Sequence, residues 1–146
     1  MLPAELAEEQ LGLEPRRKAV AVYGAVSQLQ PSRIWEGVLA RAVHADRVTI
    51  GFVDIDPGVQ VPLHQHENEQ VGFVLRGSVT MVIGGQSREL RVGETYQIAS
   101  QVPHSAKAGP DGVSVVDVFA PVREDWKGVS MLEPFPGRWP ERSPSA

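Results

Sequence analysis

Two histidines lie two positions apart in the stretch HQHENEQ, and they are the residues of this chain best suited to chemistry. His64 and His66 would point to the same face of a β-strand, because side chains alternate across a strand. Gln70 opens the next strand-like run, and His104 follows a proline that fixes the local backbone. Imidazoles gathered on one face bind transition metals, yet an H-x-H pair also occurs on solvated faces. The residues alone leave both interpretations open.

Most of the chain that must position these histidines reads as short strands separated by turn residues. Gly77, the Gly84-Gly85 pair, Gly93 and the GPDG stretch at 109–112 are expected to form turns. The expected strands cover residues 33–36, 38–44, 47–55, 59–66, 70–75, 78–83, 86–91, 95–98, 103–108 and 113–120. Many short strands at this spacing predict an all-β antiparallel sandwich or barrel.

The two ends of the chain differ from this pattern. Residues 1–32 are expected to form an N-terminal arm or a short peripheral helix, residues 33–122 the barrel, and residues 123–146 an extended tail. The tail is rich in proline and cannot continue a sheet interior. Phe135 and Trp139 within it are either loosely ordered or packed on the barrel or on a partner subunit.

Composition narrows the class of protein. The chain has 146 residues, enough for one domain that buries a core without a metal or a disulfide. It has no cysteine, which excludes disulfides, thiolate metal sites and cysteine nucleophiles. The net charge of −4 argues against nucleic acid and anionic membranes as partners. No apolar run is long enough to span a membrane and the N-terminus does not read as a signal peptide, so we expect a cytoplasmic protein.

The spacing around the histidine pair resembles the first motif of the cupin superfamily. That motif is a glycine, five residues, H-x-H, three or four residues, a glutamate, six residues and a glycine. Gly58, His64, His66 and Gly77 fall on its positions, and Gln70 stands where the glutamate is usual. The similarity therefore rests on every spacing of the motif and departs from it at one residue type.

The second cupin motif is kept in its spacing rather than in its residues. It begins at Gly93 and ends in His104, with Ala99 and Gln101 where a proline and a glycine are typical. Ala108 stands where an asparagine is usual. The two motifs cover residues 58 to 108, and the strand pattern extends the likeness over about 33 to 122.

The resemblance implies an antiparallel jelly-roll barrel, open at one end, with a divalent transition metal inside it. His64, His66, Gln70 and His104 would be the metal ligands. Such nitrogen and oxygen donors suit iron, manganese, nickel, copper or zinc, and the sequence does not choose among them. A neutral amide in place of a carboxylate leaves more of the metal's charge uncompensated, so the site is expected to bind metal more weakly and to attract an anionic ligand.

A second group of candidate residues lies in VVDVFAPVREDW. Asp117 and Phe119 would share a strand face, and Arg123 follows shortly after. An ionised carboxylate among valines is costly unless it is paired, so Asp117 either pairs with an arginine to buttress the barrel or acts as an acid/base in the cavity. This run is similar to the pectin-degradation cupins, enzymes that convert 4,5-unsaturated uronates to linear keto-sugars. That resemblance implies catalytic roles for Asp117, Phe119 and Arg123.

Four other polar or aromatic residues are expected to lie outside the ligand set. Glu67 and Glu69 fall in the predicted turn and are expected to be solvated charges at the barrel rim. His44 has no partner at ligand spacing, so we expect a surface or hairpin-end histidine. Trp35 is expected to pack in the core or at an interface.

Three functions stay open. The first, which we favour, is a metal-dependent enzyme of lyase or isomerase type acting on a small, anionic, hydroxylated metabolite such as an unsaturated uronate. The second is a metal-dependent oxygenase that uses dioxygen, and the third is a cupin that binds a sugar or other metabolite without catalysis. We expect a homodimer made by sheet packing or arm exchange, because small jelly rolls expose sheet edges and faces.

Overall fold

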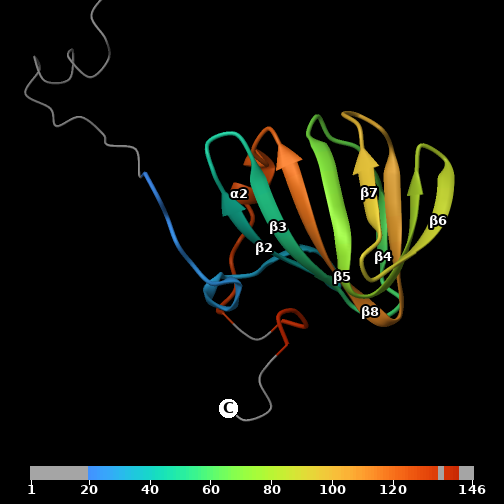
Figure 1. The fold of residues 1–146 in the computed structure, drawn as a ribbon, viewed down its shortest axis with the longest axis horizontal. Coiled ribbons are helices and arrows are strands. Elements are labelled where there is room, and N and C mark those ends of the chain that lie inside the picture. Colours follow the sequence, from blue (N-terminus) through green and yellow to red (C-terminus); the bar gives the residue numbers. More distant parts are fainter. Residues whose placement is uncertain (1–19, 135–136, 142–146) are drawn as a thin grey trace, which may run out of the picture.

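The computed structural model describes residues 20–134 and 137–141, so residues 1–19 of the expected N-terminal arm or helix, and Phe135, lie outside the described part. The chain folds as an antiparallel jelly-roll barrel, as predicted (Figure 1). The strands are β1 (Ser32–Trp35), β2 (Val38–His44), β3 (Thr49–Ile55), β4 (Gln60–His64), β5 (Glu69–Ile83), β6 (Gln86–Arg91), β7 (Thr95–Ile98) and β8 (His104–Ala120). A 3-10 turn, η1 (Val26–Gln28), precedes them and a short helix, α2 (Glu124–Lys127), follows.

Two long strands, β5 and β8, hold the barrel together. The order of neighbouring strands is β1-β2-β3-β8-β5-β6, while β4 pairs with β8 and β7 pairs with β5. The second half of β8 lies between β3 and the first half of β5, and its first half lies between β4 and the second half of β5. Each long strand therefore belongs to both walls of the barrel.

The long strands bend where turns were expected. Gly77 and Gly112 both have positive φ (77° and 75°), and a Cβ on Gly77 would overlap the carbonyl oxygen of Gly112. The predicted turn at 109–112 is wrong, because the strand conformation of β8 continues through it. The ladder between β5 and β8 absorbs the bend through register shifts on both sides of Gly77. The glycines mark a close backbone approach, not a chain reversal.

The hairpin expected at Gly84-Gly85 is confirmed. Ile83 pairs with Gln86, so only the two glycines connect β5 to β6. Both have positive φ, 55° and 82°, as a type I′ turn requires.

The C-terminal segment packs on the outer face of the barrel, which confirms one of the two expectations for Trp139. The Trp139 ring stacks on Phe52 of β3 with 5.8 Å between centroids. Arg138 donates to the carbonyl of Ile55 at 2.6 Å and to the carboxylate of Asp56 at 2.8 Å. Its backbone N–H donates to Asp54 at 3.2 Å. Within the described residues, no helix is long and apolar enough to cross a membrane.

Candidate metal centre and adjoining cavity

Three histidines meet at one end of the barrel. His64 is the last residue of β4, and its partner across the ladder is His104, the first residue of β8. Their ring centroids lie 4.2 Å apart, and His66 lies 4.9 Å from His104 and 5.8 Å from His64. One ligand nitrogen from each lies within 4.8 Å of the others. The strand expected over 59–66 ends at His64, so His66 reaches the cluster from the loop after β4. The carbonyl of His66 accepts a hydrogen bond from the backbone N–H of Gln101 at 2.8 Å.

Each imidazole uses its Nδ1 atom in a bond to a backbone carbonyl two residues away. The acceptors for His64, His66 and His104 are the carbonyls of Pro62 (2.7 Å), Asn68 (2.9 Å) and Val102 (2.8 Å). A carbonyl only accepts, so each Nδ1 carries the hydrogen and each Nε2 keeps a free lone pair. Metal-binding histidines are oriented by this kind of bond from the other ring nitrogen.

The three imidazoles are held in the neutral form that binds metal. Burial is the largest cause lowering the pKa of His64, His66 and His104, and it takes the pKa of His104 to about 4. The Nε2 atom of His104 is buried and has no hydrogen-bond partner among residues 20–134 and 137–141. A buried acceptor without a partner is costly, whereas a metal ion would use its lone pair. The residues present therefore fit a divalent transition metal.

Gln70, near the start of β5, lies beside this cluster as the sequence predicted. Its Oε1 is 3.1 Å from the Nε2 of His66. Because the Nδ1 of His66 carries the ring hydrogen, these two atoms are both acceptors. Two acceptor lone pairs this close favour a cation between them.

Asp117 is buried on β8 and is held by two side chains. The hydroxyl of Tyr96 on β7 donates to its Oδ1, and Gln70 donates a side-chain hydrogen bond to the same carboxylate. Burial raises the pKa of Asp117 to about 6, against the lowering effect of these bonds and of the charge of Arg123. Of the two alternatives for Asp117, pairing with an arginine is not the arrangement found: its hydrogen bonds come from a phenol and an amide.

Sequence reasoning missed Tyr96, because no motif marks it. The side chain reaches Asp117 across Gly72, its partner in β5, which also pairs with Asp117 in β8. A Cβ on Gly72 would overlap Asp117 Oδ1, the tyrosine hydroxyl and the carbonyl of Val116. Burial, and then the neighbouring carboxylate, raise the pKa of Tyr96 well above 10, so its hydroxyl remains a donor. Gly72 was the available signal for this contact, but it can be interpreted only when the pairing of β5 with β7 and β8 is known.

Arg123 forms one wall of the site, and its hydrogen-bonding edge is already occupied. The guanidinium carbon lies 4.7 Å from the centroid of the Phe119 ring and 4.6 Å from that of the Trp126 ring. Its Nε and Nη2 donate to the two oxygens of Asp125 at 3.0 and 2.8 Å. The guanidinium fork of Arg123 therefore holds a carboxylate of its own chain. The Asp125 side chain is 64% exposed, so water reaches this pair.

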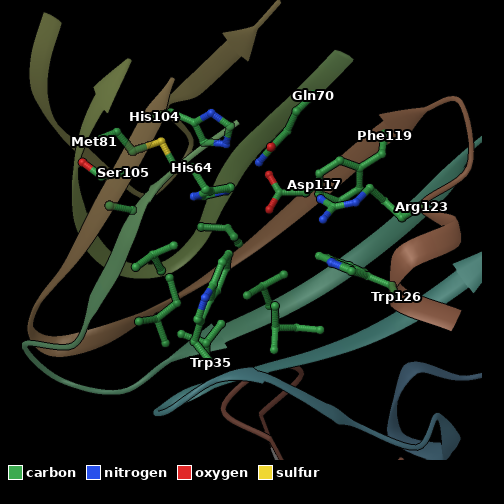
Figure 2. Close-up of a pocket in the computed structure, with 17 residues that line it drawn as sticks. Trp35, His64, Gln70, Met81, His104, Ser105, Asp117, Phe119, Arg123 and Trp126 are labelled. Atoms are coloured by element: carbon green, nitrogen blue, oxygen red, sulfur yellow. The ribbon is translucent and has the colours of Figure 1, made fainter. Parts of the chain in front are cut away.

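One end of a cavity of about 610 Å³, its open mouth included, is lined by His64, Gln70, His104, Asp117 and Arg123 (Figure 2). The deeper wall is apolar, with aliphatic side chains from β1 to β5 and β8. Trp35, expected in the core or at an interface, lies in this wall with its ring 4.9 Å from that of His64. Trp126 also lines the cavity, and its buried indole N–H has no acceptor within the part of the chain that the structure describes. It is a donor available to a ligand.

The remaining polar residues lie outside the cluster, as expected, although Glu69 is the first residue of β5 and not part of a turn. Glu67 and Glu69 are exposed. His44 ends β2 at the hairpin to β3, where its Nδ1 lies 2.8 Å from the hydroxyl of Thr49. It is not part of the histidine cluster.

The jelly-roll barrel and its histidine cluster define a class, and the comparisons with known proteins agree with it. Residues 51–119 match the family model described as "Cupin domain". The chain contains a segment similar to a cupin domain and has the barrel fold of solved cupins. Within the cupins it is similar to the "Pectin degradation protein KdgF" of Dickeya dadantii (strain 3937), with 31% identity over 64 residues, 43% of this chain and 58% of that protein.

Two further similarities bear on the fold and on the alternatives. The structure of KdgF from Halomonas sp. superposes with a TM-score of 0.69 at 24% identity, covering 73% of this chain and 99% of that one. The "HTH-type transcriptional regulator PuuR" of Escherichia coli (strain K12) is 39% identical over 41 residues, 28% of this chain and 22% of the regulator. This chain aligns with less than two thirds of the length of either curated relative.

Proposed function

We propose that this protein is a metal-dependent enzyme of lyase or isomerase type, and that its substrate is a small anionic metabolite such as a 4,5-unsaturated uronate. The observation that carries the proposal is the convergence of free acceptor atoms beside a buried acid. The Nε2 atoms of three neutral imidazoles and the Oε1 of Gln70 meet next to Asp117 and Arg123. The similarity to a pectin degradation protein supports the choice of a uronate.

His64, His66, Gln70 and His104 would hold the metal, which would supply Lewis acidity toward a substrate oxygen. Asp117 moves the proton: it takes the proton of the ring's hemiacetal hydroxyl and delivers it to the carbon of the double bond that does not carry the ring oxygen. The hydroxyl O–H bond, the ring C–O bond and the C=C π bond break, and two carbonyl groups and one C–H bond form. No oxidant or reductant takes part. The buried position of Asp117 and its bond from Tyr96 keep its carboxyl group in one orientation for this transfer.

Arg123 recognises the carboxylate of the substrate. We propose that this carboxylate takes the place of Asp125 on the guanidinium fork, because Asp125 is exposed and its pair with Arg123 is therefore easily exchanged. Phe119 and Trp126, which contact each other, both pack against the guanidinium of Arg123. The free indole N–H of Trp126 offers a further donor to a substrate hydroxyl.

The test is the loss of ultraviolet absorbance of an unsaturated uronate, compared with its uncatalysed rate. Protein loaded in turn with iron, manganese, nickel, copper or zinc is expected to accelerate the loss, and chelation is expected to abolish the acceleration. Asp117→Asn keeps the shape but removes the proton carrier, so it is expected to lower turnover by about 10²- to 10⁴-fold. No acceleration with any of the five metals would refute the uronate proposal.

The likeness to a transcriptional regulator favours a second candidate, the binding of a metabolite without chemistry. The two functions separate in one experiment. A metal-loaded protein that binds uronates in calorimetry but does not change their absorbance is a binding module.

We also propose a homodimer, formed through the outer face of β2, β3, β8 and β5. One row of paired residues crosses all four strands and is apolar throughout: Val43, Ile50, Val118 and Val71. The most exposed apolar side chains of this face are 39% to 46% exposed: Val43, Val71, Phe73 and Val118. A continuous apolar patch is unusual on a monomer, and two-fold dimers are the commonest assemblies.

A further inference from the structure

The amide of Gln70 lies between two groups that both accept hydrogen bonds. On one side is the Nε2 of His66, 3.1 Å from Oε1 of the amide. On the other side is the carboxylate of Asp117, which accepts a hydrogen bond from the amide. Figure 2 shows the amide end of Gln70 directed at this carboxylate. An amide has one donor end and one acceptor end, so both neighbours are satisfied only when the NH₂ group faces Asp117 and a cation lies between Oε1 and the imidazole.

Asp117 selects that orientation. A carboxylate is an acceptor, so the NH₂ end of Gln70 must face it, and the oxygen must then face the imidazoles. The opposite orientation would place the amide oxygen against a buried carboxylate, with no hydrogen between them. The orientation of the Gln70 amide is therefore fixed only if the carboxylate of Asp117 is itself held in place.

Tyr96 fixes that position. Its buried hydroxyl donates to Oδ1 of Asp117, and Gly72 leaves the space that lets the two groups meet. The second oxygen remains available for Gln70. A chain of hydrogen bonds thus runs from the phenol to the carboxylate to the amide, and the amide oxygen at its end lies beside the histidine cluster.

We propose that Tyr96, Asp117 and Gln70 form a positioning relay, which aims the amide oxygen of Gln70 at the metal and requires an amide at position 70 as long as position 117 is an aspartate. This inference rests on the proposed metal site and adds to it a role for Tyr96 and a reason for the glutamine. A glutamate at position 70 would set two buried carboxylates against each other. An asparagine at position 117 would remove that conflict, because its NH₂ group donates to a carboxylate.

The first experiment measures cobalt(II) binding to metal-free protein by visible absorption, whose bands report the ligand set. Tyr96→Phe removes one hydroxyl and is expected to weaken cobalt binding by about 10-fold, the lower end of what outer partners of metal ligands contribute, and to change the bands. The matched control is Tyr23→Phe, because Tyr23 is 93% exposed and far from any relay contact. Cobalt binding and bands like those of wild type in Tyr96→Phe would overturn the proposal.

The second experiment uses urea unfolding of the metal-free protein. Gln70→Glu is expected to lower the urea midpoint, and the double variant Gln70→Glu/Asp117→Asn is expected to recover it. Failure of the second substitution to recover the midpoint would overturn the relay, even if Tyr96→Phe does not fold.

The readouts separate this inference from the proposed function. If the variants change cobalt binding and the urea midpoint as expected but wild type does not turn over uronates, the relay stands and the uronate substrate is refuted. Wild type that binds no cobalt would refute the metal site, and the urea comparison would still decide the relay.

Discussion

The ion pair between Arg123 and Asp125 gives the sharpest prediction about substrate binding. If a substrate carboxylate replaces Asp125 on the guanidinium fork, then Asp125 competes with the substrate. Asp125→Ser removes the competitor and leaves the contacts of Arg123 with Phe119 and Trp126 in place. The variant is therefore expected to bind anionic ligands more tightly than wild type.

The magnitude follows from the exposure of the pair. The Arg123 side chain is 7% exposed but that of Asp125 is 64% exposed, so solvent screens the interaction. Exposed ion pairs contribute about 0.2 to 1 kcal/mol, which corresponds to an increase in affinity of about 1.5- to 5-fold. A larger gain would mean that the pair is stronger than its exposure allows.

The assay is isothermal calorimetry of metal-loaded protein with galacturonate, a carboxylated sugar that lacks the unsaturated bond. Glu124→Ser is the matched control, because Glu124 is the neighbouring acid in the first turn of α2 and pairs with Lys127 at 3.2 Å instead of Arg123. It removes the same charge without freeing the fork. Weaker binding in Asp125→Ser than in Glu124→Ser would refute the exchange and make Asp125 a residue that holds Arg123 in place.

Three further predictions concern the fold and the assembly. Gln101 has a φ of 63°, so Gln101→Gly is expected to stabilise the protein by about 0.5 to 1 kcal/mol in urea unfolding, and a loss of stability would contradict the strain. Gly72→Ala is expected to destabilise by at least about 1 to 3 kcal/mol because its Cβ meets backbone and buried side chains, whereas Gly24→Ala, with open space around it, is expected to have little effect. Phe73→Glu is expected to convert a dimer to a 15.9 kDa monomer in light scattering, whereas Val92→Glu, on an exposed turn, is expected to leave the dimer intact. Equal masses for the two variants would rule out the proposed face.

The cupin motifs were readable from the sequence because their glycines carry a backbone requirement. Gly58, Gly77 and Gly93 all have φ between 70° and 84°, a region that favours glycine. Gln101 stands where the second motif usually has a glycine, and its φ of 63° is positive like those of the motif glycines. The motif therefore survives as a backbone shape where the residue type has changed, which explains why its spacing was the more reliable signal.

The contacts around the cavity were not readable in the same way. Tyr96 and Asp117 are 21 residues apart, and they meet only because β7 and β8 pair with the same residue of β5. Asp125 was visible two positions after Arg123, but its bond to the guanidinium fork depends on the turn into α2. Spacing along the chain predicts neighbours on one strand, whereas these contacts depend on register and on the path of the chain after the barrel.

The most direct test of the central claim is metal binding itself. Metal-free wild type, titrated with cobalt(II) and then zinc, is expected to bind about one equivalent. His104→Ala is expected to lose more than the roughly 10- to 100-fold that an outer partner contributes, while His44→Ala, whose ring bonds Thr49 away from the cluster, is expected to bind as wild type does. Undiminished binding in His104→Ala, or no binding in wild type, would contradict the account.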